Sequence, residues 1–242
     1  MSYHWDWGVF LQHASKNQTF LDWMLSGFEV TLALGLSAWL IALILGTLLG
    51  VMRTLPSRSL RTIGAAYVEL FRNVPLLVQF FIWYFAVPEI MPYGADFKHL
   101  PPFTQQFIAA VVCLGVFTAA RVCEQVRSGI NSLPRDQKYA GLAMGLTMMQ
   151  TYRYILLPVS FRIVLPPITS EFLNIFKNSA IASTIGLMEL AAQGRQLVDY
   201  TAHSYESFTA VTLLYAVISV CVMVIMWLVE RACRVPGMSL RK

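Results

Sequence analysis

Three long stretches of this 242-residue chain contain apolar and small residues but no charged side chain. They cover residues 30–52, 101–120 and 207–229. A helix needs roughly 20 residues to cross the hydrocarbon layer of a membrane. Each stretch therefore predicts a membrane-spanning helix.

Two further stretches are apolar enough to span a membrane but contain polar residues. Residues 73–88 reach span length if the helix begins near Tyr67, which brings in Glu69 and Arg72, three residues apart and able to pair. Residues 163–188 are long enough, but a helix with their polar groups must pack inside protein or line a cavity. Those groups are Glu171, Asn174, Lys177 and Asn178. We expect five spans.

Lys and Arg residues are distributed unevenly between the segments that join these spans. Such residues accumulate in cytoplasmic loops. With the N-terminus outside, the outer segments hold Lys16, Lys98 and Arg195. The inner segments then hold Arg53, Arg58, Arg61, Arg127, Arg135, Lys138, Arg153, Arg162, Arg231, Arg234, Arg241 and Lys242. The pattern predicts a periplasmic N-terminus and a cytoplasmic C-terminus, and it explains the net charge of +5 without a nucleic-acid partner.

Composition supports a single membrane domain. Hydrophobic residues make up 57% of the chain and charged residues 13%, against about 25% charged in a soluble domain. The first residues lack the pattern of a cleavable signal peptide. Trp5, Trp7 and Phe10 suggest a segment at the outer membrane interface. We expect a periplasmic or interfacial segment over residues 1–24, an all-α membrane domain over 25–232 and a cytoplasmic tail over 233–242.

The His and Cys residues give no sign of a metal site or a disulfide framework. No His pair has a spacing such as H-E-x-x-H. The Cys residues lie in or beside the predicted spans, far apart in sequence, and we expect them to be small buried apolar residues. They are Cys113, Cys123, Cys221 and Cys233.

Motifs of nucleotide and hydrolytic chemistry are absent from the sequence. It contains neither a Gly-x-x-x-x-Gly-Lys-Ser/Thr phosphate loop nor a Gly-x-Ser-x-Gly elbow. We therefore expect a protein that is not an enzyme. Transport, channel and receptor functions remain.

An inner segment between the third and fourth spans, residues 128–162, has an unusual character. Its centre, KYAGLAMGLTMMQTYRYILLP, mixes charged and polar residues with many Ala, Leu and Met residues. Residues 136–145 follow Pro134 and can form a short helix that ends before Gly145. Such an apolar helix can lie in the lipid interface or dock in a groove on a soluble partner, and physical chemistry alone leaves both possibilities open.

The spacing in this segment resembles the cytoplasmic signature of the membrane subunits of bacterial ABC importers. Gly145 is followed after nine residues by Ile155, and then by Leu157 and Pro158, which matches G-x9-I-x-L-P. The family pattern opens with Glu-Ala-Ala, and its positions are occupied here by Tyr139, Ala140 and Gly141. The resemblance implies a type I importer transmembrane domain, whose coupling helix inserts into a cleft of an ATP-hydrolysing subunit.

Three other segments resemble the branch of that family that handles polar amino acids. They are YVELFRNVPLLVQFFIWY, CEQVRSGINSLPRDQ and IFKNSAIASTIGL. Details such as LFRNVPL and TAARVCEQVR are most similar to glutamate/aspartate permeases, which pair with a second, related permease. The resemblance implies alternating access, a periplasmic binding protein and two ATPase copies that bind ATP and Mg. It implies no cofactor in this chain.

Two departures from the branch pattern suggest an acidic substrate. Arg121 stands where the branch commonly has Tyr, three residues before Glu124, and Asn178 stands where it commonly has an acid. Both changes make the path more positive, and Arg can hold a carboxylate through two hydrogen bonds. We predict substrate contacts from Arg121, Glu124 and the neighbouring Lys177, Asn178 and Ser179.

Structural explanations of the same residues stay open. Arg121 could instead pair with Glu124 or reach the interface, and Lys177 could join an internal network with Glu171 and Asn174. Pro75, Pro166 and Pro167 are expected at helix boundaries or kinks. A channel or secondary transporter for a small polar solute is the alternative function, although it leaves the apolar inner segment unexplained.

Overall fold

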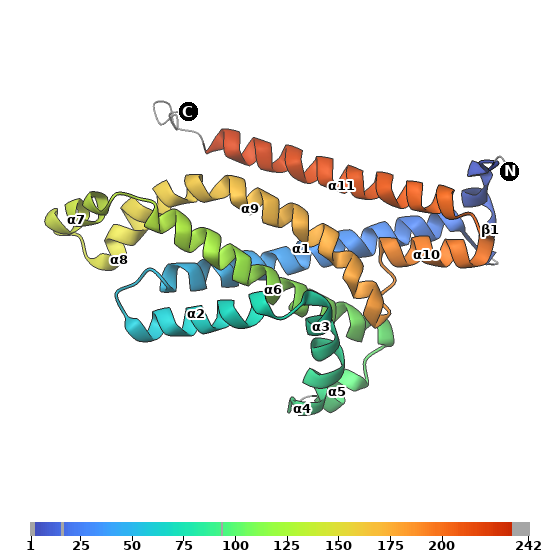
Figure 1. The fold of residues 1–242 in the computed structure, drawn as a ribbon, viewed down its shortest axis with the longest axis horizontal. Coiled ribbons are helices and arrows are strands. Elements are labelled where there is room, and N and C mark those ends of the chain that lie inside the picture. Colours follow the sequence, from blue (N-terminus) through green and yellow to red (C-terminus); the bar gives the residue numbers. More distant parts are fainter. Residues whose placement is uncertain (1–2, 16, 93, 234–242) are drawn as a thin grey trace. The chain divides into compact units, whose positions relative to one another are not determined.

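The computed structural model describes residues 3–15, 17–92 and 94–233. They form two compact units, and the predicted tail from residue 234 onward lies outside the described part. The first unit comprises Met1–Trp39, Pro75–Gly115 and Asn174–Val220, and the second comprises Leu40–Val74, Val116–Leu173 and Cys221–Lys242. The elements run in the order shown by the colours in Figure 1.

Four of the described helical stretches are long and apolar enough to cross a membrane. They are α1 (Phe20–Met52), α6 (Pro102–Asn131), the continuous stretch Met148–Ile185 and α11 (Ser204–Ala232). Within the third stretch, α8 (Met148–Thr151), the π-helical η3 (Tyr152–Leu156), α9 (Leu157–Ser179) and the 3-10 helix η4 (Ala180–Ile185) follow one another. Each predicted uncharged run lies inside one of these longer helices, except that Pro101 directly precedes α6.

The fifth predicted span is a broken pair of helical segments. Helix α2 (Arg58–Asn73) is bent by 101° relative to the stretch Leu76–Ile90. That stretch consists of α3 (Leu76–Phe81), the π-helical η2 (Ile82–Ala86) and α4 (Val87–Ile90). The described part of the chain therefore has four candidate spans, or five if the bent pair counts as one.

The break falls at Pro75, as the sequence predicted. Pro75 has φ −56° and ψ 136° and caps the start of α3. Its ring lacks an N–H and disfavours helical geometry at the residue before it, so the helix ends at Asn73. The Asn73 amide donates a hydrogen bond of 2.9 Å to Glu69, and among the described ion pairs none joins Glu69 to Arg72.

The other two prolines do not mark a boundary. Pro166 and Pro167 lie inside α9, which is already helical from Leu157. Of the two predicted roles, a helix start is wrong for both, because the fourth span starts at Met148 and not at residue 163, and a kink at these prolines stays a prediction.

The N-terminal segment of the first unit is folded against the first and last spans. It contains a 3-10 helix η1 (Trp7–Leu11) and a two-stranded antiparallel hairpin, β1 (His13–Ser15) with β2 (Gln18–Thr19). The hairpin is a small exception to the predicted all-α class, and α1 begins at Phe20, before the predicted domain boundary. A buried apolar cluster joins η1, α1, α10 (Leu190–Thr201) and α11. Its members are Val9, Phe20, Met24, Leu190, Leu197 and Val211.

Glu189 is the buried polar centre of the first unit. Its carboxylate accepts hydrogen bonds from the backbone of Ala191 (3.0 Å) and Ala192 (2.8 Å), which caps α10. The Tyr215 hydroxyl from α11 donates a third hydrogen bond of 2.8 Å. The backbone N–H of Leu190 binds the Thr31 hydroxyl at 3.1 Å. Side chains of α1 and α11 therefore fix the start of α10.

In the second unit, the end of α1 packs with α2 and α6. The cluster of buried residues consists of Leu49, Val68, Ala120 and Cys123. The Tyr67 hydroxyl donates a hydrogen bond of 2.6 Å to the carbonyl of Val116. A Cβ at Gly46 would lie 2.7 Å from the carbonyl oxygen of Ala119, so glycine allows α1 and α6 to approach closely.

The cysteines divide into two pairs by exposure. Cys113 and Cys123 are buried, as predicted for small apolar residues. Cys221 is exposed and Cys233 is half-buried, so that prediction is wrong for both. All four are free thiols.

Candidate functional site

The predicted docking helix is α7 (Arg135–Ala143), and Gly145 ends it. Gly145 has φ +82°, and its N–H binds the carbonyl of Leu142 at 3.0 Å. The N–H of Leu146 binds the carbonyl of Gly141 at 3.1 Å. This pair of bonds satisfies the last carbonyls of a helix when the residue after the cap is left-handed, which glycine tolerates best. The prediction that Gly145 lies just past the helix is confirmed.

We name residues 135–156, comprising α7, α8 and η3, the coupling segment. Large apolar side chains on it are exposed, and Met144 and Met149 reach 79% and 74% exposure. The other exposed members are Tyr139, Leu142 and Tyr154. Tyr139, Leu142 and Met144 come before the fourth candidate span, and exposed apolar side chains outside a span mark an interaction surface.

Tight packing inside the coupling segment explains one departure from the importer signature. A Cβ at Gly141 would lie 2.8 Å from Cδ1 of Ile155 and 2.9 Å from Cγ2 of Thr151. The Ala of the signature would therefore need one of these side chains to shift. Thr147 caps α8 through reciprocal hydrogen bonds with Gln150, which fixes the turn between α7 and α8.

The stretch between the third and fourth spans is shorter than the predicted loop over residues 128–162. Helix α6 continues to Asn131, and helical structure resumes at Met148. Figure 1 shows α7 and α8 side by side where α6 ends and α9 begins.

Glu124 on α6 is held between two arginines. Arg127 donates to it from Nε (3.1 Å) and Nη2 (2.9 Å), one helical turn away. Arg53, directly after α1, forms a second ion pair with the same carboxylate, and its side chain is mostly buried. The alternative in which Glu124 pairs with Arg121 is therefore wrong. Sequence reasoning missed Arg53 as a partner because it comes from a distant part of the chain.

Arg121 faces another helix of the second unit. Its Nη1 lies 3.9 Å from Oε2 of Glu171 on α9, and its guanidinium carbon lies 5.1 Å from the ring centroid of Phe117. Glu171 is buried, whereas 43% of the Arg121 side chain is exposed. Arg121 lies well inside α6 and not at its end, and its side chain is partly exposed.

The other predicted substrate residues lie in the first unit, at the end of α9. Lys177 is exposed in the last turn, where its charge is favourable for the helix dipole. The sequence placed it midway along a span that began at residue 163, but the helix begins much earlier. Asn178 is half-buried, and the buried Ser179 hydroxyl donates to the carbonyl of Phe176 at 2.6 Å.

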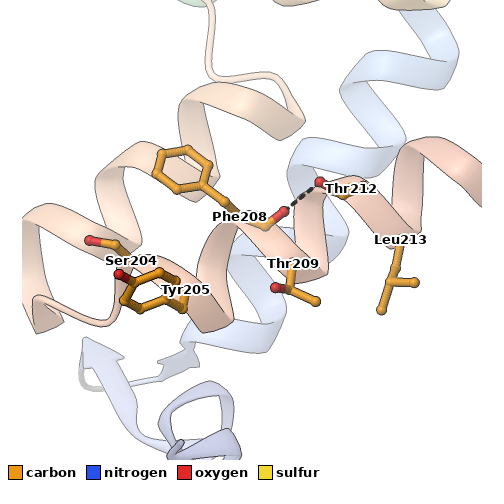
Figure 2. Close-up of a pocket in the computed structure, with 6 residues that line it drawn as sticks. All are labelled: Ser204, Tyr205, Phe208, Thr209, Thr212 and Leu213. Atoms are coloured by element: carbon orange, nitrogen blue, oxygen red, sulfur yellow. Dashed lines mark hydrogen bonds between the residues drawn. The ribbon is translucent and has the colours of Figure 1, made fainter. Parts of the chain in front are cut away.

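A hollow of about 540 Å³ lies on one face of α11 (Figure 2). Its lining combines aromatic rings, hydroxyl groups and one Leu side chain, and the Thr212 hydroxyl donates to the Phe208 carbonyl at 2.7 Å. The lining residues are Ser204, Tyr205, Phe208, Thr209, Thr212 and Leu213. None of them was predicted to bind substrate.

Comparison with known proteins identifies the class of this fold. Residues 42–235 match the family model described as "Binding-protein-dependent transport system inner membrane component". The glutamate/aspartate import permease protein GltJ of Escherichia coli K12 is 57% identical over 241 residues, 98% of either chain. The probable amino-acid permease protein YxeN of Bacillus subtilis is 30% identical and covers 89% of this chain and 97% of its own.

Solved structures show the same fold. An amino acid ABC transporter crystallised with histidines matches with a TM-score of 0.72 and 26% identity, over 88% of this chain and 95% of that one. The inward-facing MetNI methionine transporter matches with a TM-score of 0.67 and 20% identity, over 89% and 96%.

The molecule is therefore a membrane permease component of a binding-protein-dependent ABC importer. The chain belongs to the family of binding-protein-dependent transport system inner membrane components. It is a multi-pass inner-membrane protein of an amino-acid transporter, and the ATPase is a different subunit of such systems. The predicted class, location and non-enzymatic role are confirmed.

Proposed function

We propose that this permease carries glutamate and aspartate across the inner membrane by alternating access. The observation that carries the proposal is the 57% identity to a glutamate/aspartate import permease, which extends over 98% of both chains. Neither sequence has room for a large insertion or a missing span at this coverage.

Arg121 is our candidate for the residue that meets the acidic side chain. Its guanidinium is partly exposed and has Glu171 at 3.9 Å, a longer separation than a direct charge-assisted hydrogen bond. A substrate carboxylate can approach the exposed edge and form two parallel hydrogen bonds, which Lys could not form. Lys177, Asn178, Ser179 and Glu124 stay predicted contributors to the path or its surroundings.

The exposed apolar surface of the coupling segment supports docking in a groove of the ATPase. Burying such a surface removes apolar area from water at about 25 cal/mol per Å². The proposed assembly has two ATPase copies, which bind ATP and Mg, a periplasmic binding protein and a second, related permease. ATP binding and hydrolysis shift the permease between orientations only to the extent that the partners bind the two states differently.

The proposed orientation places the N-terminus in the periplasm and the C-terminus in the cytoplasm. The excess of Lys and Arg in the inner segments supports it. In a variant that keeps Cys233 as the single cysteine, a membrane-impermeant maleimide should label inverted vesicles but not intact cells with a permeabilised outer membrane. Labelling of the intact cells would show that the C-terminus lies in the periplasm and would contradict the proposed orientation.

Uptake by cells tests the transport function. Deletion of the gene should abolish binding-protein-dependent uptake of labelled glutamate and aspartate, and re-expression should restore it. If uptake continues at the same rate after the ATPase gene is removed, the chain acts as a channel or secondary transporter instead.

A further inference from the structure

Four aromatic side chains gather where the N-terminal segment meets the start of α11. Trp5 and Trp7 stack with ring centroids 5.5 Å apart, and Tyr3 makes edge contacts with Trp5 (5.6 Å) and Tyr205 (4.6 Å). We name Tyr3, Trp5, Trp7 and Tyr205 the aromatic cluster. Each of the four is between 44% and 60% exposed, so their rings form a continuous outward surface.

A buried carboxylate holds this cluster in place. Glu206, in the first turn of α11, has no exposed surface. It accepts a hydrogen bond from the Tyr3 hydroxyl and another, of 2.7 Å, from the backbone N–H of Asp6. The first of these raises the pKa of Tyr3 to about 12, so the phenol stays a donor at neutral pH. His203 approaches the same carboxylate at 3.8 Å. The segment before the first span is thereby fixed to the last span.

The surface of the cluster continues along α11 as an apolar helical face. Leu213, Val217 and Val220 are exposed on it, at spacings of four and three residues that keep them on one side. The hollow in Figure 2 lies at the beginning of this face, and Tyr205 belongs both to its lining and to the cluster. The aromatic cluster, whose rings carry polar N–H and O–H groups, therefore lies next to an aliphatic surface on α11.

We propose that the aromatic cluster and the hollow beside it form a phospholipid-binding surface that holds the start of α11 at the boundary between headgroups and acyl chains. Trp and Tyr favour this boundary because their rings are apolar and their N–H and O–H groups need water or headgroup partners. The continuity with the apolar face of a spanning helix selects lipid as the occupant. The four rings carry no formal charge and Glu206 is buried, whereas Asp6 between Trp5 and Trp7 is exposed on the water side of this boundary.

Depth-specific photolabelling by lipid tests the proposal in the assembled transporter. The probes are phosphatidylethanolamines with a diazirine either near the glycerol backbone or at the end of an acyl chain, in phosphatidylethanolamine vesicles. At 1.5 Å per residue, Val217 lies about 18 Å beyond Tyr205 along α11, close to the middle of a hydrocarbon layer about 30 Å thick. The glycerol-level probe should label residues 3–11 and Tyr205, and the chain-end probe should label Val217 and Val220.

The Glu206→Ala variant tests the role of the buried carboxylate. Glycerol-level labelling of residues 3–11 should fall about tenfold, because two hydrogen bonds to a charged acceptor are lost. Labelling of Val217 by the chain-end probe should stay unchanged and reports that α11 is still inserted. The proposal is overturned if the wild-type cluster takes up neither probe. It is also overturned if adding the binding protein removes the labelling, or if the cluster is labelled without the second permease but not in the assembled transporter, since a protein would then be the occupant.

Discussion

The hydroxyl of Tyr152 donates a hydrogen bond of 2.8 Å to the backbone carbonyl of Thr54, 98 residues earlier in the chain. Tyr152 is buried at the beginning of η3, inside the coupling segment, and Thr54 lies in the turn between α1 and α2. Both belong to the second unit. The coupling segment, which we expect to move with the ATPase, is thus hydrogen-bonded to the turn that follows the first span.

Removing this hydroxyl should weaken coupling more than assembly. Tyr152→Phe keeps the buried ring but leaves the partly buried Thr54 carbonyl without its donor, a cost of at most about 1–3 kcal/mol. We expect normal co-purification of the ATPase and several-fold less substrate transported per ATP hydrolysed. Tyr154→Phe is the matched control, because Tyr154 is exposed on the same turn. An unchanged transport ratio in Tyr152→Phe would show that the bond does not transmit the motion.

The left-handed conformation of Gly145 makes a different prediction for the end of α7. Nothing lies within 4 Å of a Cβ built there, so size alone is no obstacle. A β-branched residue at φ +82° should cost about 1–2 kcal/mol, whereas Asn tolerates this region. Gly145→Val should reduce ATPase stimulation in proteoliposomes, and Gly145→Asn should retain most of it. Equal ATPase stimulation in both variants would show that coupling does not depend on the backbone conformation at the end of α7.

Arg121 should control substrate affinity. Arg121→Lys keeps the charge without the planar fork and should retain partial glutamate uptake, and Arg121→Ala should retain very little. Arg127→Ala is the control on the same helix. Arg127 binds Glu124, so we expect this variant to change the stability of the protein but not its half-saturation concentration for glutamate. The measurement is the half-saturation concentration for glutamate in reconstituted vesicles. An unchanged half-saturation concentration in Arg121→Ala would show that Arg121 has a structural role and does not bind substrate.

Glu189 should make the stability of the first unit depend on pH. Burial raises the pKa of its carboxyl group, although the hydrogen bonds from Ala191, Ala192 and Tyr215 oppose the shift. The folded chain therefore keeps this proton to a higher pH than the unfolded chain. The thermal unfolding temperature in detergent should fall as pH rises from the ordinary carboxyl range through the raised pKa.

The Glu189→Gln variant removes that titration and should show a flatter profile over the same pH range. Glu69→Gln serves as the control, because Glu69 is exposed. Identical profiles for Glu189→Gln and the unchanged protein would mean that Glu189 does not titrate in this range.

Local rules allowed several of these features to be predicted from the sequence. The spans follow from uncharged runs, the bend at Pro75 follows from the missing N–H, and Gly145 follows from the preference of helix ends for glycine. Each depends on residues that are close together in the chain. The spacing from Gly145 to Pro158 could be compared with a family pattern for the same reason.

Contacts between distant segments could not be predicted in this way. One alternative paired Arg121 with Glu124 on its own helix, but the carboxylate that faces it is Glu171 on α9. Glu124 is engaged by Arg53, which precedes it by 71 residues. Which face of one helix meets which face of another depends on packing over the whole unit, and the hydrophobic pattern of a single span does not determine it.

Transport by the purified system tests this account most directly. The chain, its ATPase, a second permease and the binding protein are reconstituted in vesicles, and uptake of labelled glutamate is followed with and without ATP. We expect uptake that requires both ATP and the binding protein, and that excess aspartate suppresses while excess glutamine does not. Uptake that proceeds without ATP, or that glutamine suppresses as strongly as aspartate, would contradict an ATP-driven importer of acidic amino acids.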